Sequence, residues 1–249
     1  MIRGAALITG AARRIGRALA LEAAKAGYDL AIHHRDAQAD ADSLAAEITA
    51  LGRRAVVLAA DLSLEDEVQG LIPAAKAALG PVTLLVNCAS LFEDDRLPSL
   101  TTASWDAHMA VNLKAPVLLT QAFARALDGQ AGLVVNIVDQ RATHPNPLFF
   151  SYTLSKTALM TATTMAAQAL APAIRVNAIG PGPVLASVHQ DAAAFAAEAA
   201  ATPLAKAVAP AEIAAALRYL IDAPSVTGQM ICVDAGQHLA WRTPDIQEP

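Results

Sequence analysis

The chain has 249 residues, of which 55% are hydrophobic and 16% charged, and its formal net charge is −5. This length and composition predict one large α/β domain with a well-buried core rather than two small domains. A nucleic-acid-binding face needs an excess of basic residues, so the negative charge argues against that class of partner. The two cysteines, Cys88 and Cys232, lie far apart without CxxC spacing, which suggests neither a disulfide framework nor a zinc site and indicates a reducing compartment.

Neither a targeting segment nor a membrane span is expected from the apolar stretches. The first ten residues hold an early arginine and only a short apolar run before Gly10. The longest uncharged stretch, residues 157–174, contains Gln168 and Pro172. A spanning helix would need about 20 mainly apolar residues. We therefore expect a cytoplasmic protein with no membrane partner.

Short apolar runs alternate with longer helical segments along the chain. The pattern predicts strands at residues 5–9, 30–33, 55–60, 84–87, 133–138, 175–178 and 230–233, and helices at 15–26, 39–51, 64–79, 103–127, 151–170 and 211–221. Several of the strands are nearly continuous apolar runs, as expected where both faces of a sheet are covered. The alternation predicts a single α/β domain over residues 1–249, with a doubly wound parallel sheet and helices on both faces.

Residues 184–205 stand apart from this alternation. The stretch 192–201 is rich in alanine, and Pro181, Pro183 and Pro203 flank it. Two interpretations stay open: a helix on the surface, or a mobile lid over a substrate pocket.

A glycine-bearing turn, Thr9-Gly10-Ala11-Ala12-Arg13-Arg14-Ile15-Gly16, joins the first strand to the first helix. Glycines let the backbone approach a pyrophosphate closely, and a helix N-terminus supplies amide donors and a favourable dipole. Two glycines at this spacing are weak evidence alone, but their position directly after the first strand favours a dinucleotide site.

A tyrosine and a lysine, Tyr152 and Lys156, follow the fifth predicted strand at i and i+4. On a helix this spacing places both side chains on one face, within reach of a shared ligand. A free tyrosine is a poor acid at neutral pH, and a nearby ammonium group lowers its pKa. The pair therefore predicts a tyrosine that exchanges protons during catalysis.

These motifs occur together with four others in a fixed order along the chain, namely Asn87-Cys88-Ala89-Ser90, Asn112, Pro181-Gly182 and Val233-Asp234-Ala235-Gly236. The whole set resembles the short-chain dehydrogenase/reductase family from Leu7 to Gly236. The resemblance implies a Rossmann-type fold, a nicotinamide cofactor and a homotetramer. It also implies that Lys156 holds the nicotinamide ribose and lowers the pKa of Tyr152, and that Asn112 holds a water linking Lys156 to solvent.

Two departures from the usual family pattern point to one branch. Arg14 stands where the middle glycine of the turn is usual, and Asp139 stands where a serine is usual. Both features, together with Ser90 and Phe92, resemble pteridine reductases. That resemblance implies that Phe92 stacks on a pterin ring, and that Arg14, Ser90, Asp139 and Tyr152 contact the substrate.

Asp139 also carries a chemical argument of its own. A serine hydroxyl donates a hydrogen bond to a ketone oxygen, whereas an ionised aspartate cannot donate and would repel a developing alkoxide. An aspartate suits ring N–H or amino groups, or a proton delivered to a ring nitrogen. The alternative is that Asp139 merely caps the turn that follows it.

The end of the second predicted strand bears on cofactor choice. An acidic residue there binds the ribose hydroxyl of NAD, whereas an arginine accommodates the 2′-phosphate of NADP. We align His34 with the acidic position and Arg35 with the phosphate-binding one, so NADPH is favoured; a longer strand would instead bring Asp36 into place. The cofactor-binding residues expected from the resemblance are Gly10, Arg13, Arg14, Ile15, Gly16, His34, Arg35, Asp61, Leu62, Asn87, Ala89, Ser90, Tyr152, Lys156, Pro181, Gly182 and Val184.

The sequence thus favours an NADPH-dependent reductase acting on a dihydropterin or dihydrofolate, with a small molecule as its partner. The first alternative is a carbonyl reductase of the same fold, for instance one acting on a 3-oxoacyl thioester. The second is a non-catalytic NADP-binding protein, against which the intact Asn112, Tyr152 and Lys156 argue. No metal is expected, because His33 and His34 have no ligand at suitable spacing and suit packing and surface positions.

Overall fold

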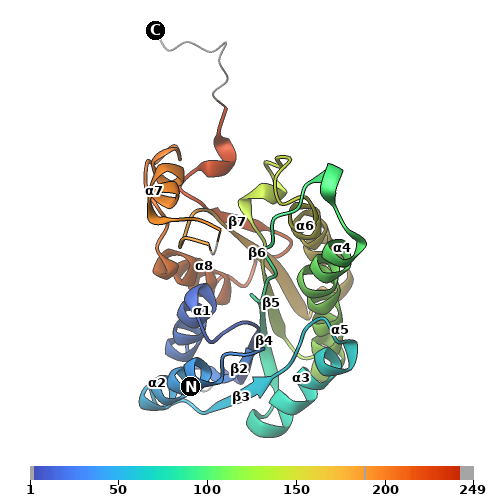
Figure 1. The fold of residues 1–249 in the computed structure, drawn as a ribbon. Coiled ribbons are helices and arrows are strands. Elements are labelled where there is room, and N and C mark those ends of the chain that lie inside the picture. Colours follow the sequence, from blue (N-terminus) through green and yellow to red (C-terminus); the bar gives the residue numbers. More distant parts are fainter. Residues whose placement is uncertain (1–2, 188, 242–249) are drawn as a thin grey trace.

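The computed structural model describes residues 3–187 and 189–241. Within these residues, seven parallel strands form one sheet in the order β3-β2-β1-β4-β5-β6-β7 (Figure 1). The strands are β1 (Ala5–Ile8), β2 (Asp29–His34), β3 (Ala55–Ala59), β4 (Val82–Asn87), β5 (Gly132–Ile137), β6 (Ile174–Pro181) and β7 (Met230–Val233). The doubly wound single-domain α/β fold expected from the sequence is confirmed.

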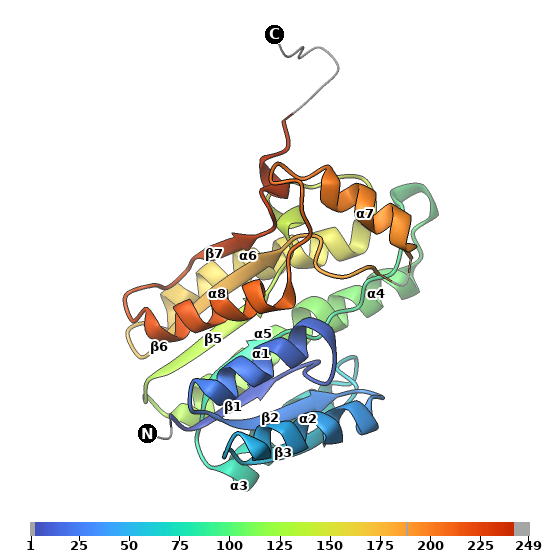
Figure 2. The same ribbon diagram turned by 90° about the vertical axis from the view of Figure 1, so that its left-hand side faces the viewer.

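Helices cover both faces of the sheet. They are α1 (Arg14–Lys25), α2 (Gln38–Ala50), α3 (Glu65–Leu79), α4 (Thr102–Met109), α5 (Ala115–Leu127), α6 (Phe150–Leu170), α7 (Ala192–Ala200) and α8 (Pro210–Asp222). Helices α1, α2 and α8 lie on one face, which faces the viewer in Figure 2, and α3, α5 and α6 lie on the other. Each face therefore has its own apolar core.

The central strand β1 shows why the apolar runs are continuous rather than alternating. Successive side chains of a strand point to opposite faces of the sheet. Ala6 and Ile8 pack into the core under α1 and α8, whereas Ala5 and Leu7 pack into the core under α3 and α5. All four are fully buried. A strand with helices on both faces must be apolar at every position.

The helix predicted over residues 103–127 is interrupted, which corrects that prediction. Helix α4 ends at Met109, a π-helical turn spans Ala110–Lys114, and α5 begins at Ala115. A π-turn inserts an extra residue and breaks the regular bonding pattern, and such turns occur often at functional sites. The fully buried Asn112 lies in this turn.

The segment 184–205 lies beyond the carboxyl edge of the sheet, where it carries α7 (Figure 1). Asp191 caps α7 by accepting a hydrogen bond from the amide of Ala194 at 2.8 Å. Val188 of this segment lies outside the described residues. The alanine-rich stretch is therefore helical, and its action as a lid stays a prediction.

The strand order places a functional edge at the carboxyl ends of the strands. The chain winds outward from β1 in both directions, because β1 pairs with β2 on one side and β4 on the other. In such sheets, ligands bind in the crevice where the strand order reverses. In the described part of the chain, no helix is both long and apolar enough to cross a membrane.

Candidate active site

A cleft of about 610 Å³ opens at this edge of the sheet. The sequence-predicted residues that line it are Gly10, Arg13, Arg14, Ile15, Gly16, Arg35, Asp61, Leu62, Ala89, Ser90, Phe92, Asp139, Tyr152, Lys156, Pro181, Gly182 and Val184. His34, Asn87 and Asn112, which we expected in the same site, are outside the cleft lining. The fold therefore gathers most of the candidate residues from segments spread over the whole chain.

The two glycines of the turn, Gly10 and Gly16, lie too close to neighbouring backbone to carry a side chain. Gly10 has a φ of 63°, and a Cβ placed there would lie 2.9 Å from the Cα of Ala89. A Cβ at Gly16 would overlap the carbonyl of Gly10. The two glycines allow the turn to fold against the end of β4 and to enter α1 directly.

His33 holds this turn from the neighbouring strand. Its Nδ1 accepts a hydrogen bond from the amide of Gly10 at 3.0 Å. Its Nε2 must therefore carry the proton, which it donates to the carbonyl of Ala60 at 3.1 Å. Burial lowers the pKa of His33 to about 4, so the ring is neutral at physiological pH. We expected a packing residue here, and the structure shows one that also lines the cleft.

His34 is the last residue of β2, where we expected it, but it is outside the lining of the cleft. Its Nδ1 accepts from the amide of Ala37 at 3.2 Å, and its Nε2 lies 3.1 Å from the side-chain oxygen of Gln38. It is buried against the start of α2 because adjacent residues of a strand point to opposite faces. The residue before His34 and the two residues after it, namely His33, Arg35 and Asp36, line the cleft instead.

Three arginines bring positive charge to the cofactor side of the cleft. Arg13 pairs with Asp40 at 2.6 Å, and the exposed Arg35 pairs with Asp36 at 3.2 Å. The third, Arg14, donates from Nη2 to two carbonyls of the segment after β6, at 3.0 Å each. Arg14 has a φ of 53°, so it adopts the left-handed conformation that glycine would favour there.

Tyr152, Asp139 and Lys156 converge at the inner end of the cleft. The hydroxyl of Tyr152 donates to Oδ2 of Asp139 at 2.8 Å. The ammonium group of Lys156 donates to the carbonyl of Ile137 at 2.8 Å and lies 5.8 Å from the centre of the Tyr152 ring. Tyr152 is 6% exposed and Lys156 only 2%, so both act in an environment with little water.

The charges of this group differ from our expectation for Tyr152. Burial, followed by the adjacent Asp139 carboxylate, raises the pKa of Tyr152 well above its ordinary value, so Lys156 does not dominate it. Burial also raises the pKa of Asp139. Burial lowers the pKa of Lys156 to about 8. Tyr152 is thus a neutral hydrogen-bond donor, whose proton stays on the hydroxyl and faces Oδ2 of Asp139.

Asp139 caps the turn that follows it, as the alternative interpretation held, and it also contacts Tyr152. Its Oδ1 accepts from the amide of Arg141 at 2.8 Å and so caps the short 3-10 helix Gln140–Ala142. Its other oxygen accepts from Tyr152. The cap fixes the carboxylate while leaving one oxygen directed to the tyrosine.

Asn112 is bound to the walls of the cleft rather than exposed in it. Its Oδ1 accepts from the amide of Leu91 at 2.8 Å and from the hydroxyl of Ser90 at 3.2 Å. Its Nδ2 donates to the carbonyl of Leu91 at 2.9 Å and to the hydroxyl of Ser155 at 3.1 Å. The π-turn therefore ties the loop after β4 to α6, one residue before Lys156.

The strand-end residues Asn87 and Asp61 have local partners. Asn87 donates to the side-chain oxygen of Asn136 on β5 at 2.8 Å and so links two neighbouring strands. Asp61 accepts from the amide and the hydroxyl of Ser63, at 2.8 and 2.7 Å, and these bonds lower its pKa. Asp61 is thus a fixed anion at the end of β3.

An aromatic cluster lies beside Tyr152. The rings of Phe92 and Phe149 are stacked with centroids 4.2 Å apart and an interplanar angle of 11°. Phe92 also meets the Tyr152 ring edge-on at 4.7 Å. His189 from the segment 184–205 contacts the carbonyl of Phe92 at 3.1 Å. Phe92 was expected at the site, whereas Phe149 was not, because nothing in its sequence position indicates a stacking partner.

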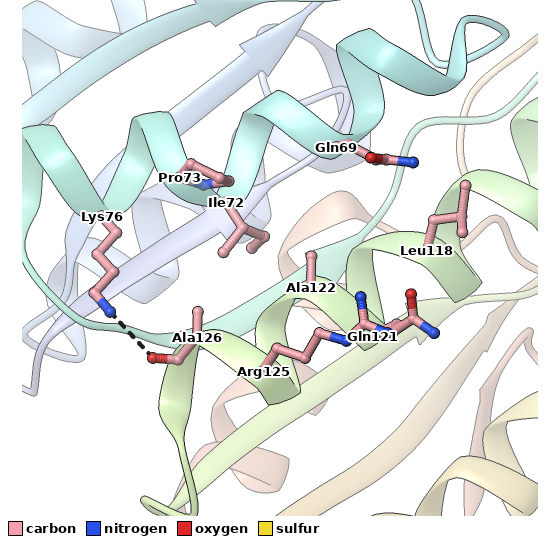
Figure 3. Close-up of a pocket in the computed structure, with 9 residues that line it drawn as sticks. All are labelled: Gln69, Ile72, Pro73, Lys76, Leu118, Gln121, Ala122, Arg125 and Ala126. Carbon is pink, nitrogen blue, oxygen red and sulfur yellow. Dashed lines mark hydrogen bonds between the residues drawn. The ribbon is translucent and has the colours of Figure 1, made fainter.

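A second hollow, of about 450 Å³, lies between α3 and α5 (Figure 3). Its floor includes Ile72, Leu118 and Ala122, and Lys76 crosses one end to donate to the carbonyl of Ala126 at 3.3 Å. It shares no lining residue with the cleft and holds none of the predicted site residues. The chemically useful groups are in the cleft.

Comparison with known proteins agrees with this architecture. The family model described as short chain dehydrogenase matches residues 4–197. A crystal structure of FolM alternative dihydrofolate reductase 1 from Brucella suis in complex with NADP is 47% identical, with a TM-score of 0.95, over 99% of this chain and 100% of that chain. The FolM protein from Brucella canis complexed with NADP is 48% identical, with a TM-score of 0.94, over 98% of each chain.

A curated relative of another activity is more distant in sequence. The 3-oxoacyl-[acyl-carrier-protein] reductase of a Synechocystis strain is 31% identical over 93% of this chain and 95% of that protein. Both similarities extend over nearly the full length, and the family model covers the turn, the cleft and the Tyr152–Lys156 helix. This chain belongs to the short-chain dehydrogenase family.

Proposed function

We propose that this chain is an NADPH-dependent reductase that transfers hydride to a C=N bond of a dihydropterin or dihydrofolate, giving the tetrahydro form. The observation that carries the proposal is the hydrogen-bonded pair Tyr152–Asp139 beside the ring of Phe92. The similarity to the two Brucella FolM proteins, at 47% and 48% identity, supports the same substrate class.

A nicotinamide dinucleotide fits the residues that line the cleft. The tight turn from Gly10 to Gly16 lets a pyrophosphate approach the backbone at the start of α1, where a helix N-terminus favours negative charge. Arg35 directly follows β2 and lines the cleft, where an arginine accommodates the 2′-phosphate. The crystallised FolM relatives contain NADP. When bound, NADPH supplies the hydride.

The protein's own part in the reaction is to hold a proton for the ring nitrogen. As hydride adds to the carbon of the C=N bond, the nitrogen takes up one proton. Because the pKa of Tyr152 is raised, its hydroxyl keeps that proton near neutral pH. Tyr152 would donate this proton to the ring nitrogen, and Asp139, whose raised pKa favours its protonated form, would replace it along the hydrogen bond that joins them, so that no phenolate is left beside a carboxylate.

The remaining residues bind and orient. Lys156 is expected to hold the nicotinamide ribose. The side chain of Asn112 is fully hydrogen-bonded, so the water that links Lys156 to solvent would be held by the backbone of Asn112 in the π-turn. Phe92 offers a flat apolar surface to a planar ring, and aromatic stacking contributes about 0.5–1.5 kcal/mol beyond burial. Arg14 and Ser90 also line the cleft and would bind polar groups of the ring.

The segment 184–205 is proposed as the lid of this cleft. Arg14 holds it at the carbonyls of Leu185 and Ala186, and His189 holds it at the carbonyl of Phe92. Arg14 and Phe92 both line the cleft, so the two contacts that hold the lid lie where the substrate would bind. Substrate binding and the position of the lid would therefore be coupled.

We also propose a homotetramer in the cytoplasm. The resemblance to the family supports assembly through α5 and α6. Exposed apolar side chains on these helices, Val117, Leu154 and Met165, agree with a covered surface there. Light scattering coupled to gel filtration would measure the mass; a monomer would contradict the proposed assembly.

The function is tested by the rate of NADPH and NADH oxidation with 7,8-dihydrobiopterin, dihydrofolate and an acetoacetyl thioester. We expect turnover with NADPH and a pterin or folate, and at most weak turnover with the thioester. Activity confined to the thioester would replace this proposal by a 3-oxoacyl reductase, the activity of the Synechocystis relative. NADPH binding without turnover of any compound would indicate a non-catalytic protein.

A further inference from the structure

A buried carboxylate, Asp95, lies between the loop that carries Phe92 and the helix that carries Tyr152. Asp95 is 7% exposed. Its Oδ1 accepts from the amide of Ser151 at 2.9 Å, and its backbone carbonyl accepts from the amide of Phe150 at 3.0 Å. Its Oδ2 accepts from the hydroxyl of Ser104 at 2.7 Å. One residue thus joins the loop after β4 to α4 and α6.

The hydrogen bond from the amide of Ser151 to Asp95 takes the place of a local N-cap, which α6 does not have. Phe149, at the N-cap position, has left-handed backbone angles (φ 51°, ψ 55°) and makes no side-chain cap bond. The first amides of a helix need acceptors, and a carboxylate there also interacts favourably with the helix dipole. Asp95 supplies this acceptor from 56 residues away in the sequence.

The left-handed turn at Phe149 places its ring against Phe92. The two rings stack at 4.2 Å, and the guanidinium group of Arg141 lies 5.1 Å from the centre of the Phe149 ring. Phe92 lines the cleft, whereas Phe149 is outside its lining. Phe149 therefore supports Phe92 without belonging to the cleft wall itself.

We propose that Asp95 and Phe149 are positioning residues, which fix the stacking ring of Phe92 relative to the proton donor Tyr152. The proposal rests on the proposed function for the role of Phe92. Asp95 joins the loop that carries Phe92 to the first amides of α6, the helix that carries Tyr152. Phe149 fixes the plane of the Phe92 ring by stacking on it. Reacting groups must be placed closely, and a misplacement of 1 Å can cost about a hundredfold in rate.

The test compares Asp95→Ala and Asp95→Asn with the wild type. Asparagine keeps the oxygen that accepts from Ser151, whereas alanine loses both side-chain acceptors. We expect Asp95→Ala to lower kcat for the pterin about tenfold to a hundredfold. We expect Asp95→Asn to restore most of the loss. The Kd for NADPH should stay within about twofold in both, because none of the Asp95 contacts involves the glycine turn.

A matched control removes a helix-capping carboxylate elsewhere. Glu212 accepts from the amide of Ala209 at 2.8 Å at the start of α8, so Glu212→Ala loses a cap without touching Phe92 or Tyr152. We expect it to lower the melting temperature while leaving kcat unchanged. If Asp95→Ala does not fold, Phe149→Leu takes its place; it removes the ring stack and should raise the KM for the pterin and lower kcat.

The outcomes separate this proposal from the proposed function. The wild type is first assayed on the pterin, the folate and the acetoacetyl thioester. If only the thioester is reduced, the proposed function fails, and the variants are then compared on that substrate. If Asp95→Ala and Phe149→Leu keep the wild-type kcat and KM on the substrate that the wild type reduces, the positioning role is wrong. An equal loss in Glu212→Ala would also overturn it, because the effect would then follow stability alone.

Discussion

The two sides of the cleft are built in different ways. On the cofactor side, one turn between β1 and α1 supplies the backbone, and the ends of β2 and β3 complete the wall. On the substrate side, Phe92, Asp139 and Tyr152 come from three separate segments and are held by side-chain contacts. If the proposed function holds, NADPH binding depends mainly on local backbone, whereas the chemistry on the substrate depends on tertiary packing. Mutations should therefore separate NADPH affinity from turnover.

Tyr152→Phe is expected to separate turnover from NADPH affinity most strongly. The change removes the hydroxyl that donates to Asp139 and keeps the ring that contacts Phe92. We expect kcat to fall about a thousandfold, within the range for loss of a general acid. The Kd for NADPH, measured by fluorescence titration, should change little. A parallel loss of NADPH affinity would show that the two sides are not separable.

The next largest effect is expected for Asp139→Ser, which restores the side chain usual in the family. Pterin turnover should fall at least about a hundredfold while NADPH affinity is kept. Asp139→Asn is the matched control, because its oxygen still accepts from the amide of Arg141 and keeps the cap. Retained pterin turnover in Asp139→Ser would rule out the role that we assign to this carboxylate.

A smaller effect with the opposite pattern is expected on the cofactor side. Arg35 is exposed directly after β2 and pairs with the neighbouring Asp36. Arg35→Ala should raise the KM for NADPH about tenfold and leave kcat and the KM for NADH unchanged. Arg218→Ala, which removes a surface arginine from α8, serves as the control. An equal change with NADH would mean that Arg35 does not read the 2′-phosphate.

The last prediction concerns stability rather than kinetics, through His33 and the glycine turn that it holds. Its pKa is about 4 in the folded protein, against an ordinary value of 6.5. Between these values the unfolded chain takes up a proton and the folded chain does not. The free energy of unfolding should therefore be fully retained above pH 6.5 and fall as the pH decreases toward 4.

This linkage predicts a loss of about 2 kcal/mol between pH 7.5 and pH 5 from His33 alone. Urea unfolding at the two pH values measures it. His33→Asn cannot titrate and keeps an acceptor for the amide of Gly10, so its unfolding free energy should lose about 2 kcal/mol less over the same interval. Identical pH dependence in the two proteins would show that His33 is not the titrating group.

Local patterns predicted the parts of the molecule that local physics controls. Continuous apolar runs predicted the buried strands. The spacing of Gly10 and Gly16 predicted the turn, and in the structure a side chain at either position would collide with Ala89 or with the turn itself. The pairing of Tyr152 with Lys156 followed from helical spacing. The π-turn at Asn112 was not predicted from local spacing. The break that it makes in the helix predicted over 103–127 accompanies contacts of Asn112 to Leu91 and Ser155, which are distant in sequence.

The side chains at the ends of strands were harder to assign. His33 and His34 are adjacent and of the same type, and only the pleat of β2 directs one to the turn and the other to α2. Asp95 lies in an acidic stretch that suggests a solvated loop, yet it is buried beneath α6. The pKa of Tyr152 also depended on the fold, since burial and Asp139 outweigh Lys156.

The sequence by itself determined the succession of strands and helices along the chain, the glycine turn and the spacing of Tyr152 and Lys156 on one helix, because each depends on residues close together in the chain. The tertiary structure alone decided which of these residues meet. Asp139 reaches Tyr152, Asp95 reaches Ser151 and Phe149 stacks on Phe92 because the parallel sheet brings the ends of distant strands to one edge. Contacts across such distances are set by packing, which no local pattern encodes.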